Sequence, residues 1–286
     1  MRVDAAVVWG ASRLTEAGVE APRRTALWLL EHAVGITPTA AIAYPERMLE
    51  DGERAAFVDA VERRASGVPL QHIVGEQEFH GLAFEVTPEV LIPRPETEIL
   101  VDAAIARWWS KKRDGASSGS CNWIVDVGAG SGCIPVVLAR ECAGARVAAV
   151  DVSERALAVA RRNAARHGAD VRFVQSDLLS ALGGPFAIVT ANLPYIPDDE
   201  IATLQREVRD HDPRLALAGG PDGLDLYRRL LADASRVLAP DGVLLCEIGA
   251  GQAEAFGRIV VDADLRLSER IDDVAGIPRV MVVTRE

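Results

Sequence analysis

A polar loop bracketed by two prolines, Thr190–Pro197, carries residue types suited to chemistry on an amino group. The Asn192 side chain offers a carbonyl acceptor and an NH2 donor. Pro194 excludes Leu193 from the helical region, so the backbone stays extended and its carbonyls keep a fixed direction. Tyr195 adds a flat aromatic wall. The loop therefore predicts a site where two oxygens accept the hydrogens of an amino group beside a ring. The simpler alternative is a turn after a strand, built from ordinary turn formers.

A glycine-rich segment lies further upstream, between a predicted strand and a predicted helix. Glycines let the backbone approach a ligand closely, and the amides that open a helix can bind it. The spacing is GxGxG and not the dinucleotide fingerprint, because Cys133 occupies the last position of that pattern. Asp151 follows after about 20 residues, where a carboxylate binds ribose hydroxyls. Together they predict a site for an adenosine-containing cofactor, with a ligand-free turn as the alternative. The expected contacts are Asp126, Gly128, Ala129, Gly130, Ser131, Gly132 and Asp151.

Strands and helices alternate around both segments, and this alternation predicts a doubly wound, largely parallel sheet. The last two strands, near 265–271 and 279–284, have no helix between them, which predicts an antiparallel edge strand. The expected strands are 123–127, 146–150, 171–174, 186–190 and 242–248, and the expected helices are 134–142, 154–167, 224–238 and 252–261.

The N-terminal part reads as helices only, one of them between Pro22 and Gly35 and another over 53–65. A β-hairpin follows near 77–86, then a proline-rich extended stretch, a helix over about 96–109 and a polar loop over 110–120. We therefore expect a helical, substrate-docking domain (1–72), a hairpin linker (73–92) and a catalytic domain (93–286). A role for the first domain as a packing cap is the alternative.

Composition limits the function classes. The net charge of −11 over 286 residues argues against binding long nucleic acids, which requires a basic surface. The four cysteines have no zinc-site spacing, so no metal is expected, and they fit reduced thiols in a cytoplasmic protein. The N-terminus does not have the pattern of a signal peptide, and no apolar run is long enough to cross a membrane.

The GxGxG spacing, the acid before it and the Asn-x-Pro-Tyr loop together resemble the class I S-adenosylmethionine-dependent methyltransferases. This resemblance implies a Rossmann-like sheet and S-adenosyl-L-methionine as cofactor, with S-adenosyl-L-homocysteine as product. In that fold the acid after the third strand, here Asp177, binds the adenine amino group; capping of a helix over 178–182 is the alternative. Leu178 stands where an aromatic cofactor contact is often found. Asn192 also lies at the cofactor in this fold.

The whole chain resembles one family, the HemK/PrmC protein-(glutamine-N(5)) methyltransferases. The matching motifs are Pro93–Glu98 (PRPETE), the tract 208–225, Glu247-Ile248-Gly249 with Gln252, and 273–279. The resemblance implies methylation of the glutamine in the GGQ loop of class I peptide chain release factors, by a monomer. Two departures are Leu193, where the family usually has proline, and Pro135 early in the helix after the glycines.

The chemistry of an amide nitrogen suggests a mechanism. Its lone pair is delocalised into the carbonyl, so the enzyme must align it with the methyl group. The hypothesis is that the Asn192 side-chain oxygen and the Leu193 or Pro194 carbonyl accept the two amide hydrogens and stabilise the positive charge that develops on nitrogen. Asn192, Pro194 and Tyr195 are thus the catalytic candidates, and Leu193 joins them in substrate binding. The loop holds no Asp or His base, so proton loss is expected to follow methyl transfer.

Two other functions remain open at this point. Methylation of adenine N6 in RNA or DNA uses the same kind of loop on an extruded base, and the form NLPY also occurs in rRNA adenine dimethyltransferases. The net charge argues against a nucleic-acid substrate, because neither part of the chain is basic: residues 1–72 hold 8 Lys/Arg against 10 Asp/Glu, and the whole chain has a net charge of −11. A non-enzymatic module that senses nucleotides or binds the ribosome would bind cofactor without turnover, and the intact Asn192 loop counts against it.

Overall fold

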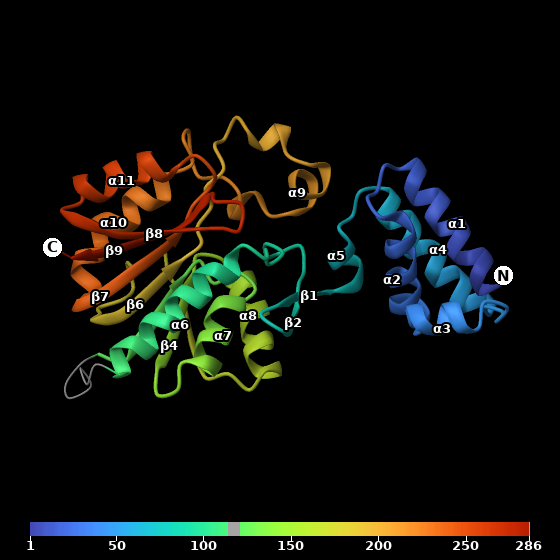
Figure 1. The fold of residues 1–286 in the computed structure, drawn as a ribbon, viewed down its shortest axis with the longest axis horizontal. Helices are drawn as coiled ribbons and strands as arrows, with labels where there is room; N and C mark the ends of the chain where they lie inside the picture. Colours follow the sequence, from blue (N-terminus) through green and yellow to red (C-terminus); the bar gives the residue numbers. More distant parts are fainter. Residues whose placement is uncertain (114–120, 286) are drawn as a thin grey trace. The chain divides into compact units, whose positions relative to one another are not determined.

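The computed structural model describes residues 1–113 and 121–285. The chain forms two compact units: Met1–Glu76 with Gln205–His211, and Gln77–Leu204 with Asp212–Glu286. Figure 1 shows the first unit as helices at the N-terminal, blue end of the chain and the second as a sheet covered by helices.

The first unit is helical, as the sequence predicts. Its core is apolar, and Leu29, Leu30 and Phe57 are fully buried between α1, α2 and α4. Two short helices, α3 and α5, were not predicted. The segment 205–211 adds another short helix to this unit, and there Glu207 pairs with the buried Arg64. The helices are α1 (Val3–Glu16), α2 (Pro22–Val34), α3 (Pro38–Ala43), α4 (Asp51–Ala65), α5 (Leu70–Val74) and α9 (Arg206–His211).

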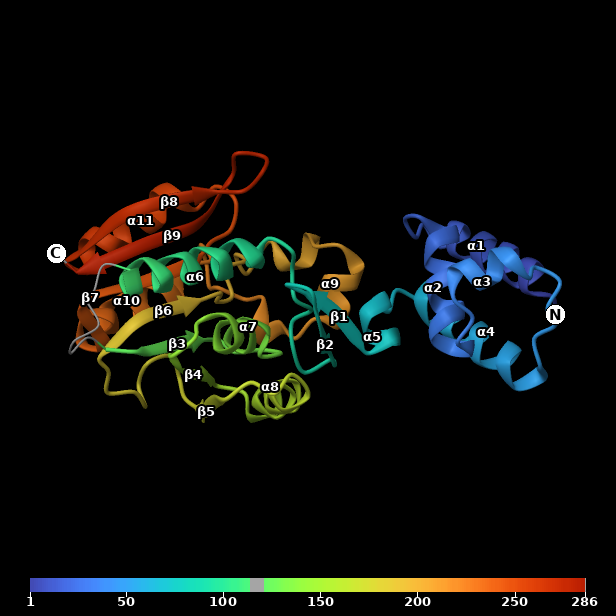
Figure 2. The same cartoon turned by 60° about the horizontal axis from the view of Figure 1, so that its bottom comes forward.

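The second unit is built on a seven-stranded sheet with the order β5-β4-β3-β6-β7-β9-β8. The first five strands in this order pair in parallel, and Figure 2 shows β5, β4, β3 and β6 side by side. This confirms the predicted class I, Rossmann-like α/β sheet. The strands are β3 (Trp123–Val127), β4 (Arg146–Asp151), β5 (Val171–Gln175), β6 (Phe186–Ala191), β7 (Leu238–Glu247), β8 (Leu265–Asp272) and β9 (Pro278–Arg285).

The antiparallel strand lies one place further in than the sequence suggested. β9 is antiparallel to β7 on one side and to β8 on the other, so β8 is the outer strand. The chain leaves β7, passes through α11 (Ala253–Asp262) to the edge, and returns by a tight turn. The returning strand therefore enters the space between β7 and β8, which the sequence pattern alone did not determine.

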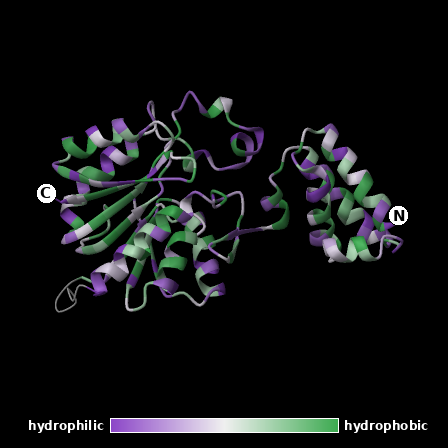
Figure 3. Ribbon diagram, viewed as in Figure 1, coloured by the Kyte–Doolittle hydropathy of each residue, from purple (hydrophilic) through white to green (hydrophobic). Residues whose placement is uncertain are grey.

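Helices cover both faces of the sheet. Ile124, Ile188 and Leu245 pack against α6 and α7 on one face, whereas Val125, Val189 and Leu244 pack against α10 and α11 on the other. Figure 3 shows the strands as mostly hydrophobic and the helices as mixed, which is typical of strands buried on both sides. The covering helices are α6 (Thr97–Arg113), α7 (Cys133–Glu141), α8 (Glu154–Arg166) and α10 (Asp225–Val237).

Helix α6 corrects one prediction. It continues to Arg113, so residues 110–113 are helical and not part of a loop; 114–120, the rest of that predicted loop, lie outside the described residues. The added turn carries Lys111, Lys112 and Arg113, and cations at a helix C-terminus stabilise it. Within the described ranges, no helix is long and apolar enough to cross a membrane.

Candidate active site

A cavity of about 580 Å³ opens at the carboxyl ends of β3, β4 and β6, where ligands bind in sheets of this kind. The glycine segment and the Asn192 loop both line it, so the two sequence-predicted sites meet in one place. Its polar and charged lining side chains come from Glu89, Arg94, Thr97, Ser131, Asp151, Ser153, Ser176, Asp177, Asn192, Arg214 and Arg229.

The glycine segment turns sharply between β3 and α7. The amides of Gly128 and Ala129 both donate to the carbonyl of Val150 at 2.9 Å, which ties the segment to β4. Gly132 has a φ of +82°, and a Cβ there would lie 2.9 Å from the Cβ of Ala160. Only glycine therefore fits where α7 meets α8. Pro135 is the third residue of α7, within the first turn, where proline is tolerated.

Asp151 ends β4 and lies at the cavity with its carboxylate already oriented. Its Oδ2 accepts the backbone N–H of Gly130 at 2.9 Å and its Oδ1 accepts that of Ser153 at 2.8 Å. Burial raises its pKa, and these backbone hydrogen bonds oppose the rise. Each oxygen keeps a lone pair, so the carboxylate can still accept hydroxyl groups of a ligand.

Asp126 lies deeper, fully buried in β3. Its Oδ1 accepts the hydroxyl of Thr190 at 2.7 Å, while Oδ2 has no hydrogen-bond partner among the described residues. Burial raises the pKa of Asp126 to about 8; the Thr190 hydroxyl opposes this rise, and the charge of Asp151 adds to it. Asp126 is not among the residues that line the cavity, whereas the glycine segment that follows it does line the cavity.

Asp177 and Leu178 both line the cavity. The structure has no helix over 178–182, so the capping alternative for Asp177 does not apply. Instead Arg229 of α10 donates to Asp177 Oδ2 at 2.6 Å, with both side chains about half exposed. Leu178 has a φ of +48°, an uncommon backbone conformation for a branched residue.

Asn192 directly follows the buried strand β6, as predicted. Its Nδ2 donates to the hydroxyl of Thr97, the first residue of α6, at 3.0 Å. Both side chains line the cavity. Because the amide NH2 faces Thr97, the side-chain oxygen of Asn192 is left for other partners.

Leu193 is anchored through both its backbone and its side chain. Its amide donates at 3.2 Å to the hydroxyl of Tyr227, which donates in turn to the carbonyl of Glu247. The side chain is buried in the core, and its Cδ2 lies 3.1 Å from where a Cβ on Gly128 would be. The site needs an apolar group here more than it needs proline, which accounts for the departure at Leu193.

Tyr195 follows Pro194 but is not among the residues that line the cavity. Its carbonyl accepts the Gln252 side-chain N–H at 2.8 Å, and a Cβ on Gly249 would lie 3.1 Å from its ring. Gly223, with a φ of +75°, lies so close that a Cβ would come within 2.1 Å of the Tyr195 carbonyl oxygen. This close packing holds the Asn192 loop against the segment that follows it.

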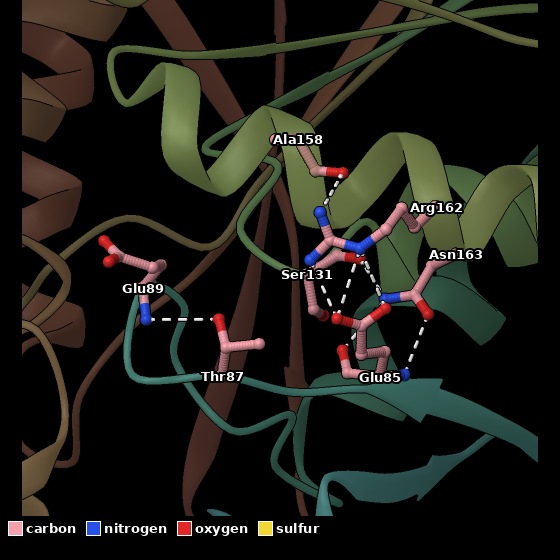
Figure 4. Close-up of polar contacts among 7 residues, drawn as sticks. All are labelled: Glu85, Thr87, Glu89, Ser131, Ala158, Arg162 and Asn163. Atoms are coloured by element: carbon pink, nitrogen blue, oxygen red, sulfur yellow. Dashed lines mark hydrogen bonds and ion pairs between the residues drawn. The ribbon is translucent and has the colours of Figure 1, made fainter.

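A buried asparagine of α8 joins the β-hairpin to the glycine segment (Figure 4). Asn163 accepts the N–H of Glu85 at 2.8 Å and donates to the carbonyls of Glu85 at 3.0 Å and Ser131 at 2.8 Å. Arg162 adds an ion pair with Glu85 at 2.7 Å. The hairpin, β1 (Glu76–Phe79) and β2 (Leu82–Glu85), is thereby fixed to the glycine segment that lines the cavity.

The structure also adds site residues that sequence reasoning did not single out. Thr97, Tyr227 and Arg229 contact predicted site residues, and Tyr227 and Arg229 occur in a helix, where their types carry no local signal. Thr97, Glu247 and Gln252 belong to motifs that carried the family resemblance, yet no role was assigned to them. Their positions depend on packing between distant segments.

Comparison with known proteins agrees with this arrangement. Residues 5–75 match a family model described as the PrmC N-terminal domain, and residues 124–211 match one described as a methyltransferase domain. The second match includes the glycine segment, Asp151, Asp177 and the Asn192 loop.

Relatives cover almost the full chain. The release factor glutamine methyltransferase of Agrobacterium fabrum is 39% identical over 285 residues, 99% of this chain and 97% of that protein. That of Geobacter sulfurreducens is 43% identical, over 86% of this chain and 84% of that protein. In fold, the chain is similar to a ribosomal protein L11 methylase from Lactobacillus delbrueckii subsp. bulgaricus, with a TM-score of 0.50 and 18% identity, covering 70% of this chain and 84% of that chain.

Proposed function

This chain belongs to the release factor glutamine methyltransferase family, and we propose that it methylates the side-chain amide nitrogen of the GGQ glutamine in class I peptide chain release factors. The family is the one that the sequence motifs predicted. One observation carries the proposal for the site: Asn192 lies at the cavity with its NH2 group turned to Thr97, so its oxygen can accept an N–H from substrate.

The chain is an S-adenosylmethionine-dependent methyltransferase. When bound, the cofactor supplies an electrophilic methyl group on a sulfonium centre. The cavity volume of about 580 Å³ lies within the range of small-molecule sites, roughly 300–1,000 Å³. The oriented carboxylate of Asp151 fits ribose hydroxyls, and the glycine segment leaves room beside it. We propose Gly128–Gly132, Asp151, Asp177 and Leu178 as cofactor contacts. We propose that Asp126 supports them from its buried position in β3.

Two oxygens of the Asn192 loop would hold the substrate amide. One is the Asn192 side-chain oxygen. For the other, the Pro194 carbonyl faces the backbone of Gly219, since a Cβ there would lie 2.7 Å from it. We therefore favour the Leu193 carbonyl, which leaves Pro194 to keep the backbone extended. Two acceptors hold the nitrogen in line and stabilise positive charge on it as the new bond forms.

Tyr195 has a different role in this proposal from the one that its sequence position suggested. Because its carbonyl is held by Gln252 and it does not line the cavity, we propose that it supports the loop and contacts substrate only at the rim. The helical unit would dock the release factor. The proposal also places the protein in the cytoplasm, where translation factors act, and retains the expected monomer.

An Asn192→Ala variant tests the role of the loop. Cofactor affinity, measured by calorimetry, should stay within about twofold, whereas methyl transfer should fall by about 10²-fold or more, since an interaction specific to the reacting nitrogen is lost. Asn122→Ala, which removes a single 3.3 Å hydrogen bond outside the cavity, is the matched control. Equal losses of cofactor affinity and turnover would overturn the assignment. Methyl transfer to adenine in RNA or DNA, with none to release factor, would overturn the substrate.

A further inference from the structure

The register of the sheet places a buried carboxylate next to the Asn192 loop. β6 and β7 are parallel, with Ala191 opposite Cys246. The next residues are Asn192, which directly follows β6, and Glu247, which ends β7, so the two come after the same pair at the carboxyl end of the sheet. Tyr227 also links Glu247 to the Asn192 loop, because its hydroxyl accepts the amide of Leu193 and donates to the carbonyl of Glu247.

Glu247 is almost completely buried, with 2% of its surface exposed. Its Oε2 has no hydrogen-bond partner in the described part of the chain. Burial raises its pKa to about 7, and hydrogen bonding from Thr97 and Asn192 opposes this rise. Arg279 also favours the charged form, and Glu96 opposes it. A buried acid without a full set of partners destabilises the fold, so a role in function is a reason to keep it there.

Thr97 connects this acid to the site. It is 2% exposed, and its hydroxyl accepts the Nδ2 of Asn192 at 3.0 Å. A hydroxyl that accepts one hydrogen bond still has its own proton to donate. Glu247 ends β7 at the level where Asn192 follows β6, and its Oε2 has no partner among the described residues, so this carboxylate can accept the Thr97 proton and the second Nδ2 proton of Asn192. Thr97 and Asn192 are also among the groups that lower the pKa of Glu247.

We propose that Glu247 is a positioning residue that, together with Thr97, fixes the orientation of the Asn192 amide. Acceptors on the protein side hold both Nδ2 hydrogens, and the side-chain oxygen faces the cavity. In the opposite orientation, an NH2 group would face the NH2 group of the substrate, and two donors cannot bind each other. This inference rests on the proposed function, because it assumes that Asn192 accepts a hydrogen from the substrate nitrogen.

The test combines kinetics with a measurement that needs no substrate. Glu247→Gln keeps the shape but replaces one acceptor oxygen by a donor, and Thr97→Val removes the hydroxyl. Both should lower kcat for release factor by about tenfold or more, with cofactor affinity within about twofold. Thr97→Ser should restore most of kcat, since it restores the hydroxyl. Glu254→Gln, at an exposed position near the start of α11, is the control.

The second readout is the Asn192 side-chain NH2 signal in ¹⁵N NMR, assigned by its loss in Asn192→Asp. Its hydrogen exchange should be slow in the unmodified protein and at least about tenfold faster in Glu247→Gln and Thr97→Val, as expected when a buried hydrogen bond is lost. Unchanged exchange and kcat in both variants would overturn the inference. If release factor is not methylated at all, the proposed function fails, while the exchange rates still decide whether Glu247 and Thr97 hold Asn192.

Discussion

The carboxylate of Asp151 holds the glycine segment in place, since its Oδ2 accepts the backbone N–H of Gly130 at 2.9 Å. Its other oxygen binds the amide of Ser153 at the start of α8. The same side chain thus shapes the segment and keeps lone pairs that can accept hydroxyl groups at the cavity. Loss of its charge should affect cofactor binding more than catalysis at saturation.

For Asp151→Asn, we expect the KM for S-adenosylmethionine to rise about 10- to 100-fold, the range for losing charge-assisted hydrogen bonds. The kcat at saturating cofactor should change far less, because Asp151 does not reach the methyl acceptor in this account. Glu154→Gln, on the exposed face of α8, should leave both constants unchanged. A fall in kcat with an unchanged KM would contradict the role given to Asp151.

Tyr227→Phe should destabilise the protein by about 1–3 kcal/mol, because the amide of Leu193 and the carbonyl of Glu247 would be buried without their partner. Both are hydrogen-bonded by the Tyr227 hydroxyl, and the side chain is fully buried. Urea unfolding measures the change. Tyr44→Phe, at a side chain that is 63% exposed, should have almost no effect. Equal stabilities for the two variants would show that this link contributes nothing.

Asn163→Ala should lower the free energy of unfolding by about 2–4 kcal/mol, since three hydrogen bonds of a fully buried side chain are lost together. Because one of them holds the carbonyl of Ser131, cofactor affinity should also fall, by several-fold. Denaturant titration and calorimetry test the two effects separately. A stable variant with unchanged affinity would mean that the contacts in Figure 4 do not position the glycine segment.

Asp126 predicts a dependence of stability on pH. Its pKa is about 8 in the folded protein against an ordinary value of 3.8, so between these values the folded state binds more protons than the unfolded state. Stability should therefore fall as pH rises from about 4 to 8. Asp126→Asn keeps an oxygen for Thr190 and removes the titration. Its unfolding free energy should decline less steeply over this window, and parallel slopes for the two proteins would contradict the prediction.

The sequence located the main elements and the two segments that form the site. Short apolar runs predicted the strands, and their alternation with helices predicted the sheet. The glycine spacing and the Asn192 loop predicted the two segments that meet at the cavity. The short helix α9 was missed because none of its residues is buried, so it has no apolar face to detect. The strand β7 begins at Leu238, earlier than expected, because the pairing of Leu238 with Phe186 extends it past Pro240 and Gly242.

The supporting contacts could not be predicted in the same way. The Asp177–Arg229 ion pair joins residues far apart in sequence, as does the Asn192–Thr97 hydrogen bond. Each depends on how α6 and α10 pack on the sheet. Tyr195 shows the same limit, since its position in the motif suggested a wall of the site, whereas Gln252 and Gly249 hold it beside the cavity. Local sequence gives residue types, and tertiary packing decides which atoms face the ligand.

The most direct test is the intact mass of a purified class I release factor after incubation with this protein and S-adenosylmethionine. A second factor, in which the glutamine of the GGQ motif is replaced, serves as the control. We expect one added methyl group on the native factor and none on the variant. An unchanged mass for the native factor, or equal methylation of both, would contradict the proposal that this glutamine is the acceptor.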